Sequence, residues 1–200
     1  ALVKQTKSVK SPLLAIQNQN ILVKLKLIER IQQMDPFQFE FLVAELLRKI
    51  GYENVEVTKR SGDKGIDVKG NLTVDGLTNV KTVIQVKRYK KGNNISGKYI
   101  TQLRGSAEVD QRGLIITTSD FTKDAKNESK AINKMPVALV NGEKLIDLLF
   151  KYKVGVKEDI VSVYSIDSEL FDTELSDNSL SGLNNKNRSI WPLPGGINSY

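Results

Sequence analysis

The order of apolar and polar residues predicts several β-strands in the middle of the chain. Apolar and polar residues alternate at 66–69 and again at 84–87, which is the period of a strand with different environments on its two faces. Two continuous apolar runs, 113–116 and 137–140, are typical of strands that are buried on both faces. A shorter strand is expected at 55–58.

Helices are predicted between these strands. The clearest starts after Asp35, a helix-capping residue followed by Pro36, and ends at Gly51. The full set of predicted helices is 13–33, 36–50, 98–110, 122–133 and 143–152. Because strands and helices alternate, the sequence predicts an α/β fold with a central mixed β-sheet flanked by helices.

The pattern divides the chain into three parts. Residues 1–34 form a basic N-terminal segment and a helix, 35–155 form the α/β domain, and 156–200 form an extension with an edge strand at 161–166 and a loosely structured tail. The helix at 13–33 has three possible roles. It packs on its own domain, links to a separate recognition domain, or makes an oligomer contact.

Charge and missing residue types narrow the function. The net charge of +7 favours a polyanionic partner such as nucleic acid. The chain has no cysteine and no histidine, which excludes disulfides, zinc fingers, thiol catalysis and Ser-His-Asp triads. No apolar run reaches the roughly 20 residues of a membrane span, and residues 1–10 lack a signal-peptide core. We therefore expect an intracellular, cytoplasmic protein.

The alternating strands carry candidate chemistry. If they pair, Asp67, Gln85 and Lys87 converge on one face. A carboxylate and an amide oxygen suit a magnesium-like ion, and the ammonium group can orient or help to deprotonate an attacking water. The alternative is a surface hairpin whose polar side chains only face water.

Basic residues flank this candidate site and are candidates for DNA binding. Neutralising phosphates and stacking on the sugar-phosphate backbone are their expected roles, and a solvated polar loop is the alternative. The residues are Lys59, Arg60, Lys64, Arg88, Tyr89, Lys90 and Lys91.

Several of these residues fall into motifs that resemble a known family. The series Gly62-Asp63-x-Gly65-Ile66-Asp67, followed by Gln85-x-Lys87-Arg88-Tyr89, resembles the catalytic core of the Mrr-like restriction endonucleases, a branch of the PD-(D/E)XK nuclease superfamily. The similarity runs from about residue 35 to about residue 155 and includes Ile116-Thr117-Thr118. Two positions depart from the superfamily pattern. Ile66 stands where proline is usual, and Gln85 stands where an acidic residue is commoner.

The resemblance implies a metal-dependent DNA endonuclease that acts in restriction or defence against foreign or modified DNA in a prokaryotic cell. It implies Mg²⁺, or Mn²⁺, held by Asp67 and Gln85 and by a helix glutamate that the resemblance places at Glu40, with Glu45 as the fallback. A homodimer or higher oligomer is expected, because cutting both strands needs two sites, and a separate domain or subunit for recognition is possible. The alternatives are a noncatalytic nucleic-acid-binding module with the same fold and a junction-resolving or repair nuclease.

Overall fold

The computed structural model describes residues 11–58 and 65–171. These residues belong to two units, Ala1–Ile160 and Val161–Tyr200. Three of the predicted DNA-binding residues, Lys59, Arg60 and Lys64, lie outside the described residues, as does the predicted tail beyond Phe171.

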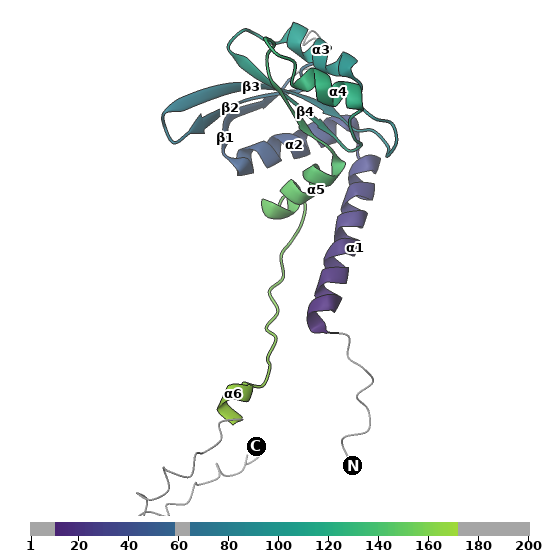
Figure 1. Cartoon of the computed structure of the whole chain (residues 1–200), viewed down its shortest axis with the longest axis vertical. Coiled ribbons are helices and arrows are strands. Elements are labelled where there is room, and N and C mark those ends of the chain that lie inside the picture. The colour runs from purple at the N-terminus through teal and green to yellow at the C-terminus, as the bar shows by residue number, and fades with distance from the viewer. Residues whose placement is uncertain (1–10, 59–64, 172–200) are drawn as a thin grey trace, which may run out of the picture. The chain divides into compact units, whose positions relative to one another are not determined.

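The first unit contains one five-stranded sheet (Figure 1). Its strands lie in the order of the chain, and the first two pairings are antiparallel while the last two are parallel. The strands are β1 (Tyr52–Val57), β2 (Val68–Val74), β3 (Thr78–Lys87), β4 (Gln111–Thr117) and β5 (Val137–Val140). The prediction of a central mixed sheet is therefore confirmed.

Five helices accompany the sheet in this unit. They are α1 (Pro12–Gln33), α2 (Pro36–Ile50), α3 (Gly97–Ser106), α4 (Lys123–Ser129) and α5 (Gly142–Lys151). The capping signals around α2 act as expected, since the Asp35 carboxylate accepts the N–H of Phe37 at 2.8 Å and Gly51 ends the helix with a left-handed φ of 112°. The second unit contributes α6 (Ser168–Phe171).

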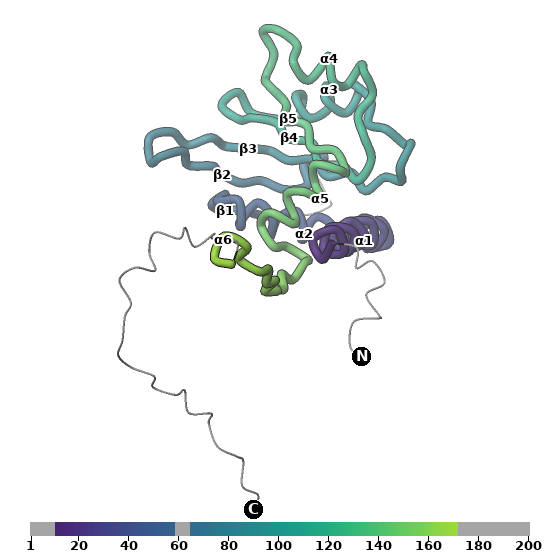
Figure 2. The backbone as a smooth tube through the Cα atoms, turned by 60° about the horizontal axis from the view of Figure 1, so that its bottom comes forward, coloured from purple at the N-terminus to yellow at the C-terminus, as the bar shows by residue number. Residues whose placement is uncertain are grey.

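The sheet has a core on each of its faces. One core packs β-residues such as Val68, Ile84 and Val86 against α2, α5 and the C-terminal end of α1. The other packs Val83 and Ile115 against α3 and α4. Figure 2 shows α3 and α4 on one side of the sheet and α1, α2 and α5 on the other.

Some predicted boundaries differ from the structure. The edge strand predicted at 161–166 is wrong, because these residues have no regular secondary structure and their apolar side chains are exposed. The helix predicted at 122–133 ends at Ser129, where the guanidinium of Arg104 donates to the backbone carbonyls of Glu128 and Ser129. The helix predicted at 98–110 ends at Ser106, since Ala107 has an extended backbone. None of the described helices is long and apolar enough to cross a membrane.

Candidate active site

Strand pairing brings Asp67 and Lys87 together. Antiparallel pairing of β2 with β3 sets Val68 opposite Ile84, and the backbone N–H of Asp67 donates to the carbonyl of Ile84 at 2.9 Å. The Asp67 carboxylate accepts the N–H of Val86 at 2.7 Å, and its Oδ2 lies 3.8 Å from the Lys87 Nζ. The strand ends therefore hold a carboxylate and an ammonium group side by side.

The charge of the Asp67 carboxylate is only partly stabilised by its neighbours. Burial raises the pKa of Asp67, and the N–H of Val86 and the nearby Lys87 only partly offset this effect. Its side chain is 19% exposed. A carboxylate that burial has deprived of water is stabilised when a cation binds beside it.

Gln85 lies deeper in the protein and has an unused acceptor. The residue is 1% exposed, which argues against a surface hairpin that only faces water. Its Oε1 is buried and has no hydrogen-bond partner in the part of the chain that the structure describes. Buried acceptors without a partner are uncommon and costly. Together with the Asp67 carboxylate, this neutral hard oxygen fits a divalent cation.

Gly65 leaves room for the Gln85 amide. The residue has a left-handed φ of 87°, and a Cβ built on it would lie 2.9 Å from Gln85 Nε2 and 3.0 Å from Gln102 Nε2. The two amide groups therefore gather over the Cα of Gly65. Gln102 belongs to α3 and is not among the residues predicted from the sequence, because an exposed glutamine on a helix follows no pattern that sets it apart.

Hydroxyl groups at the end of β4 fix the chain that follows Lys87. Thr117 Oγ1 donates to the carbonyl of Lys87 at 2.8 Å, and Thr118 Oγ1 donates to the carbonyl of Tyr89 at 2.7 Å. These hydroxyls act as structural caps and hold the backbone that carries the lysine.

The helix glutamate stays a prediction. Glu40 is half-buried on α2 between Phe39 and Val43, which are in the core, whereas Glu45 is exposed and lies 3.6 Å from Arg48. No group of three or more His, Cys, Asp or Glu side chains within residues 11–58 and 65–171 is placed to share an ion. The predicted ligands are Asp67, Glu40 and Gln85, and only the first two are of these residue types. The absence of a group of three among the described residues therefore does not test the predicted metal site.

In the basic segment at 88–91, the first two side chains make contacts within the protein and the last two face solvent. Arg88 donates to the carbonyl of Gln32 at the end of α1, and the Tyr89 hydroxyl lies 2.8 Å from that of Tyr99. This hydrogen bond, with burial, raises the pKa of Tyr89 to about 12. Lys90 and Lys91 are exposed.

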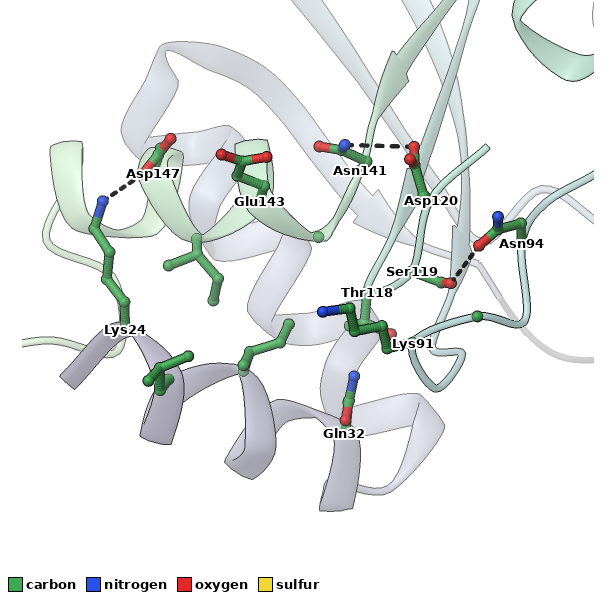
Figure 3. Close-up of a pocket in the computed structure, with 15 residues that line it drawn as sticks. Lys24, Gln32, Lys91, Asn94, Thr118, Ser119, Asp120, Asn141, Glu143 and Asp147 are labelled. Atoms are coloured by element: carbon green, nitrogen blue, oxygen red, sulfur yellow. Dashed lines mark hydrogen bonds and ion pairs between the residues drawn. The ribbon is translucent and has the colours of Figure 1, made fainter. Parts of the chain in front are cut away.

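A cavity of about 870 Å³ opens at the carboxyl ends of β4 and β5 (Figure 3). Its walls come from α1, the segment at 91–94, the end of β4 and the start of α5. Thr118 belongs both to this cavity and to the hydrogen bonds that fix the segment after Lys87. The cavity is therefore a neighbour of the candidate site.

The fold of this chain is similar to the folds of solved restriction endonucleases. The DNA modification-dependent restriction endonuclease AspBHI aligns with a TM-score of 0.57 and 24% identity over 66% of this chain and 36% of its own. The MspJI restriction endonuclease in complex with a 27-mer oligonucleotide aligns with a TM-score of 0.53 and 21% identity over 64% of this chain and 30% of its own. At these identities the likeness shows a shared fold.

The sequence comparison gives the family. A model of the Mrr_cat restriction endonuclease family matches residues 31–149, more than half of the chain, so the chain belongs to this family. The type IV methyl-directed restriction enzyme EcoKMrr of Escherichia coli (strain K12) is 29% identical over an alignment of 153 residues, and the match covers 74% of this chain and 48% of that enzyme. The chain thus spans about half the length of this curated relative.

Proposed function

We propose that this chain is the catalytic part of a metal-dependent endonuclease that hydrolyses phosphodiester bonds of DNA. The strongest support is the contact between Asp67 and Lys87 at the ends of paired strands. The Gln85 oxygen, which has no hydrogen-bond partner among the residues that the structure describes, lies on the same strand as the lysine. Membership of a restriction endonuclease family makes a nuclease the most direct use of these groups.

Each residue has a role in this proposal. Asp67 and Gln85, with Glu40, would hold Mg²⁺ or Mn²⁺, and the bound ion would supply charge stabilisation for the phosphate and lower the pKa of water. Lys87 orients or deprotonates the attacking water and balances negative charge that develops on phosphorus. The Val86 N–H keeps the Asp67 carboxylate in place.

The biological role rests on the relatives. EcoKMrr is called methyl-directed and AspBHI modification-dependent, so we propose restriction of foreign or modified DNA inside a bacterial cell. MspJI was solved with an oligonucleotide, which supports DNA as the substrate. A separate region would read the modification, since the chain spans only about half of EcoKMrr. Exposed Lys90 and Lys91, with Lys59, Arg60 and Lys64, would bind phosphates.

Plasmid cleavage tests the proposal. The wild-type chain should nick or cut plasmid DNA in the presence of Mg²⁺, and EDTA should stop the cleavage. Asp67→Ala and Lys87→Ala should each abolish cleavage but leave DNA binding intact. Lys81→Ala is the matched control, because Lys81 is on the same strand but pairs with Asp110 at 2.7 Å. Full nicking by Asp67→Ala would reject the site. Methylated and unmethylated plasmids, compared in parallel, test the preference for modified DNA.

Metal binding can be measured without DNA. By calorimetry, Gln85→Leu should lose most of the Mn²⁺ affinity, because it removes the unpartnered oxygen. Gln85→Glu should bind Mn²⁺ more tightly, because it adds a second anionic ligand of similar size. Equal affinity in the wild type and Gln85→Leu would remove Gln85 from the ligand set.

A further inference from the structure

The N-terminal two-thirds of α1 carries apolar side chains that the described residues of the first unit leave exposed. Leu14 is 44% exposed, and Ile21 and Leu25 are each 55% exposed. Only the last turns of α1 pack on the core, through Leu27, Ile28 and Ile31. A helical segment of this length without tertiary packing is marginal in water, so contact with another surface would stabilise it.

The exposed residues form a seam with coiled-coil spacing. Leu14, Asn18, Ile21 and Leu25 follow one another at intervals of four, three and four residues, and at 100° per residue they fall within an arc about 60° wide. In a heptad, Asn18 and Leu25 take position a, and Leu14 and Ile21 take position d. A single asparagine at position a is a known device for fixing the register and number of helices. We call these four residues the α1 seam.

The charge pattern selects the partner. Residues 12–23 contain no Asp, Glu, Lys or Arg, although the chain as a whole carries +7. A surface without charge cannot neutralise DNA phosphates, and it offers nothing to an oppositely charged protein. Two copies of a basic protein, however, meet with least repulsion at an uncharged surface. Side-chain amides both donate and accept, so Asn18 is complementary to a second Asn18.

The residues that flank the seam favour a parallel pair. Lys24 takes position g and Glu29 position e of the following heptad, and in a parallel coiled coil these positions of the two helices lie next to each other. Lys24 of one copy therefore meets Glu29 of the other. Lys24 is 43% exposed even while it contacts Asp147.

The C-terminal end of the seam reaches a cavity of the first unit. Leu25, the last residue of the seam, lies in one wall of the cavity of about 870 Å³ together with Ile28 and Gln32, which continue the same heptad spacing (Figure 3). The C-terminal end of the seam therefore adjoins this cavity, while Ile28 also packs on the core. This part of α1 before residue 31 also lies outside the match to the family model.

We propose that two copies of this chain associate through their α1 seams as a parallel, two-fold symmetric helix pair. Such a pair would place two candidate sites in one particle, as the proposed cutting of both DNA strands requires. The association itself is measured without DNA or metal, so its failure is separate from failure of the proposed function.

Molar mass in solution tests the interface. Light scattering and sedimentation equilibrium on the full chain should give a dimer, and Ile21→Lys should raise its dissociation constant at least about 100-fold by placing a charge in the seam. Ile16→Lys is the matched control, since Ile16 is 39% exposed on the opposite side of α1. Circular dichroism checks that both variants fold. A monomeric wild type, or equal effects of the two variants, overturns the proposal.

Disulfide trapping tests the parallel arrangement. The natural chain has no cysteine, so a single introduced thiol reports only on itself. Asn18→Cys should oxidise to a covalent dimer, because equivalent a positions face each other. Lys26→Cys, exposed on another side of α1, should not. A dimer in which Asn18→Cys fails to cross-link, or in which Lys26→Cys cross-links as readily, overturns the arrangement.

Discussion

Two ion pairs of this protein show how differently a fold uses charge. Between α3 and α4, Arg104 lies 2.5 Å from Glu128, and its guanidinium also donates to the carbonyls of Met135 and Glu128. At the ends of β2 and β3, Lys87 lies 3.8 Å from Asp67. The first pair is closely hydrogen-bonded, whereas the second is loose.

The titration of the two carboxylates differs in the same way. The pKa of Glu128 is lowered, first by its hydrogen bond from Lys134 and further by Arg104. The pKa of Asp67 is raised, because burial outweighs its hydrogen bond and the nearby lysine. A carboxylate whose charge is balanced by nearby donors, such as Glu128, stabilises the fold. A buried carboxylate whose charge is not balanced, such as Asp67, lowers the stability of the fold and can bind a cationic ligand. Perturbed groups of the second kind are characteristic of functional sites.

Asp67→Asn should have the largest effect and separate activity from stability. We expect DNA cleavage to fall at least about 1,000-fold, because the anionic ligand is lost. The free energy of unfolding should rise by about 1 kcal/mol at pH 7.5, because a buried charge is removed while the amide oxygen still accepts the N–H of Val86. Plasmid cleavage and urea unfolding of the same preparation measure both. A variant that is both inactive and strongly destabilised would contradict the comparison.

Arg104→Met should do the reverse. It leaves buried backbone carbonyls of the α3–α4 contact without a donor, so the free energy of unfolding should fall by about 3 kcal/mol. Cleavage per folded molecule should stay within about twofold at 20 °C, because Arg104 bonds to α4 and to residue 135, and not to Asp67 or Lys87. Thermal unfolding and cleavage at matched folded concentration are the two measurements.

Gly65→Ala compared with Gly76→Ala sharpens the role of the Gln85 amide. Both glycines have left-handed φ angles, 87° and 68°, but a Cβ at Gly76 meets no atom within 4 Å. Each substitution should cost about 1–2 kcal/mol of stability for the backbone. Only Gly65→Ala should weaken Mn²⁺ binding, by about 10-fold, because its methyl group displaces Gln85. Equal metal affinities in the two variants would separate Gly65 from the ligand set.

The pH dependence of stability should differ in sign between the two carboxylates, and this is the smallest effect. Because the folded-state pKa of Asp67 is raised, its contribution favours folding at low pH and is lost as pH rises through that pKa. For Glu128 the folded-state pKa is lowered, so its contribution is present at neutral pH and is lost as pH falls through that pKa. Relative to wild type, Asp67→Asn should therefore gain stability as pH rises from about 3 to 7, and Glu128→Gln should lose it. Urea unfolding at several pH values checks both slopes.

Local sequence signals determined much of this molecule. Asp35 and Gly51 bound α2, and Asn141 and Thr122 cap α5 and α4 through their side chains. Alternating and continuous apolar runs predicted segments that overlap all five strands, because strand periodicity is a property of neighbouring residues. The overlap is smallest for β2, where the prediction at 66–69 shares only residues 68 and 69 with the observed strand. The same alternation singled out Asp67, Gln85 and Lys87 as candidates for a shared site.

Only the tertiary structure decided the environment of these residues. Burial under α3 leaves the Gln85 Oε1 without a partner within residues 11–58 and 65–171 and brings Gln102 over Gly65, and neither feature follows from the strand period. The tertiary structure also places the Arg88 guanidinium against the carbonyl of Gln32 at the end of α1. Among the described residues, the segment at 161–166 pairs with no strand. The physical reason is that periodicity fixes which face a side chain takes. The burial, pKa and contacts of that side chain depend on which distant segment covers the face.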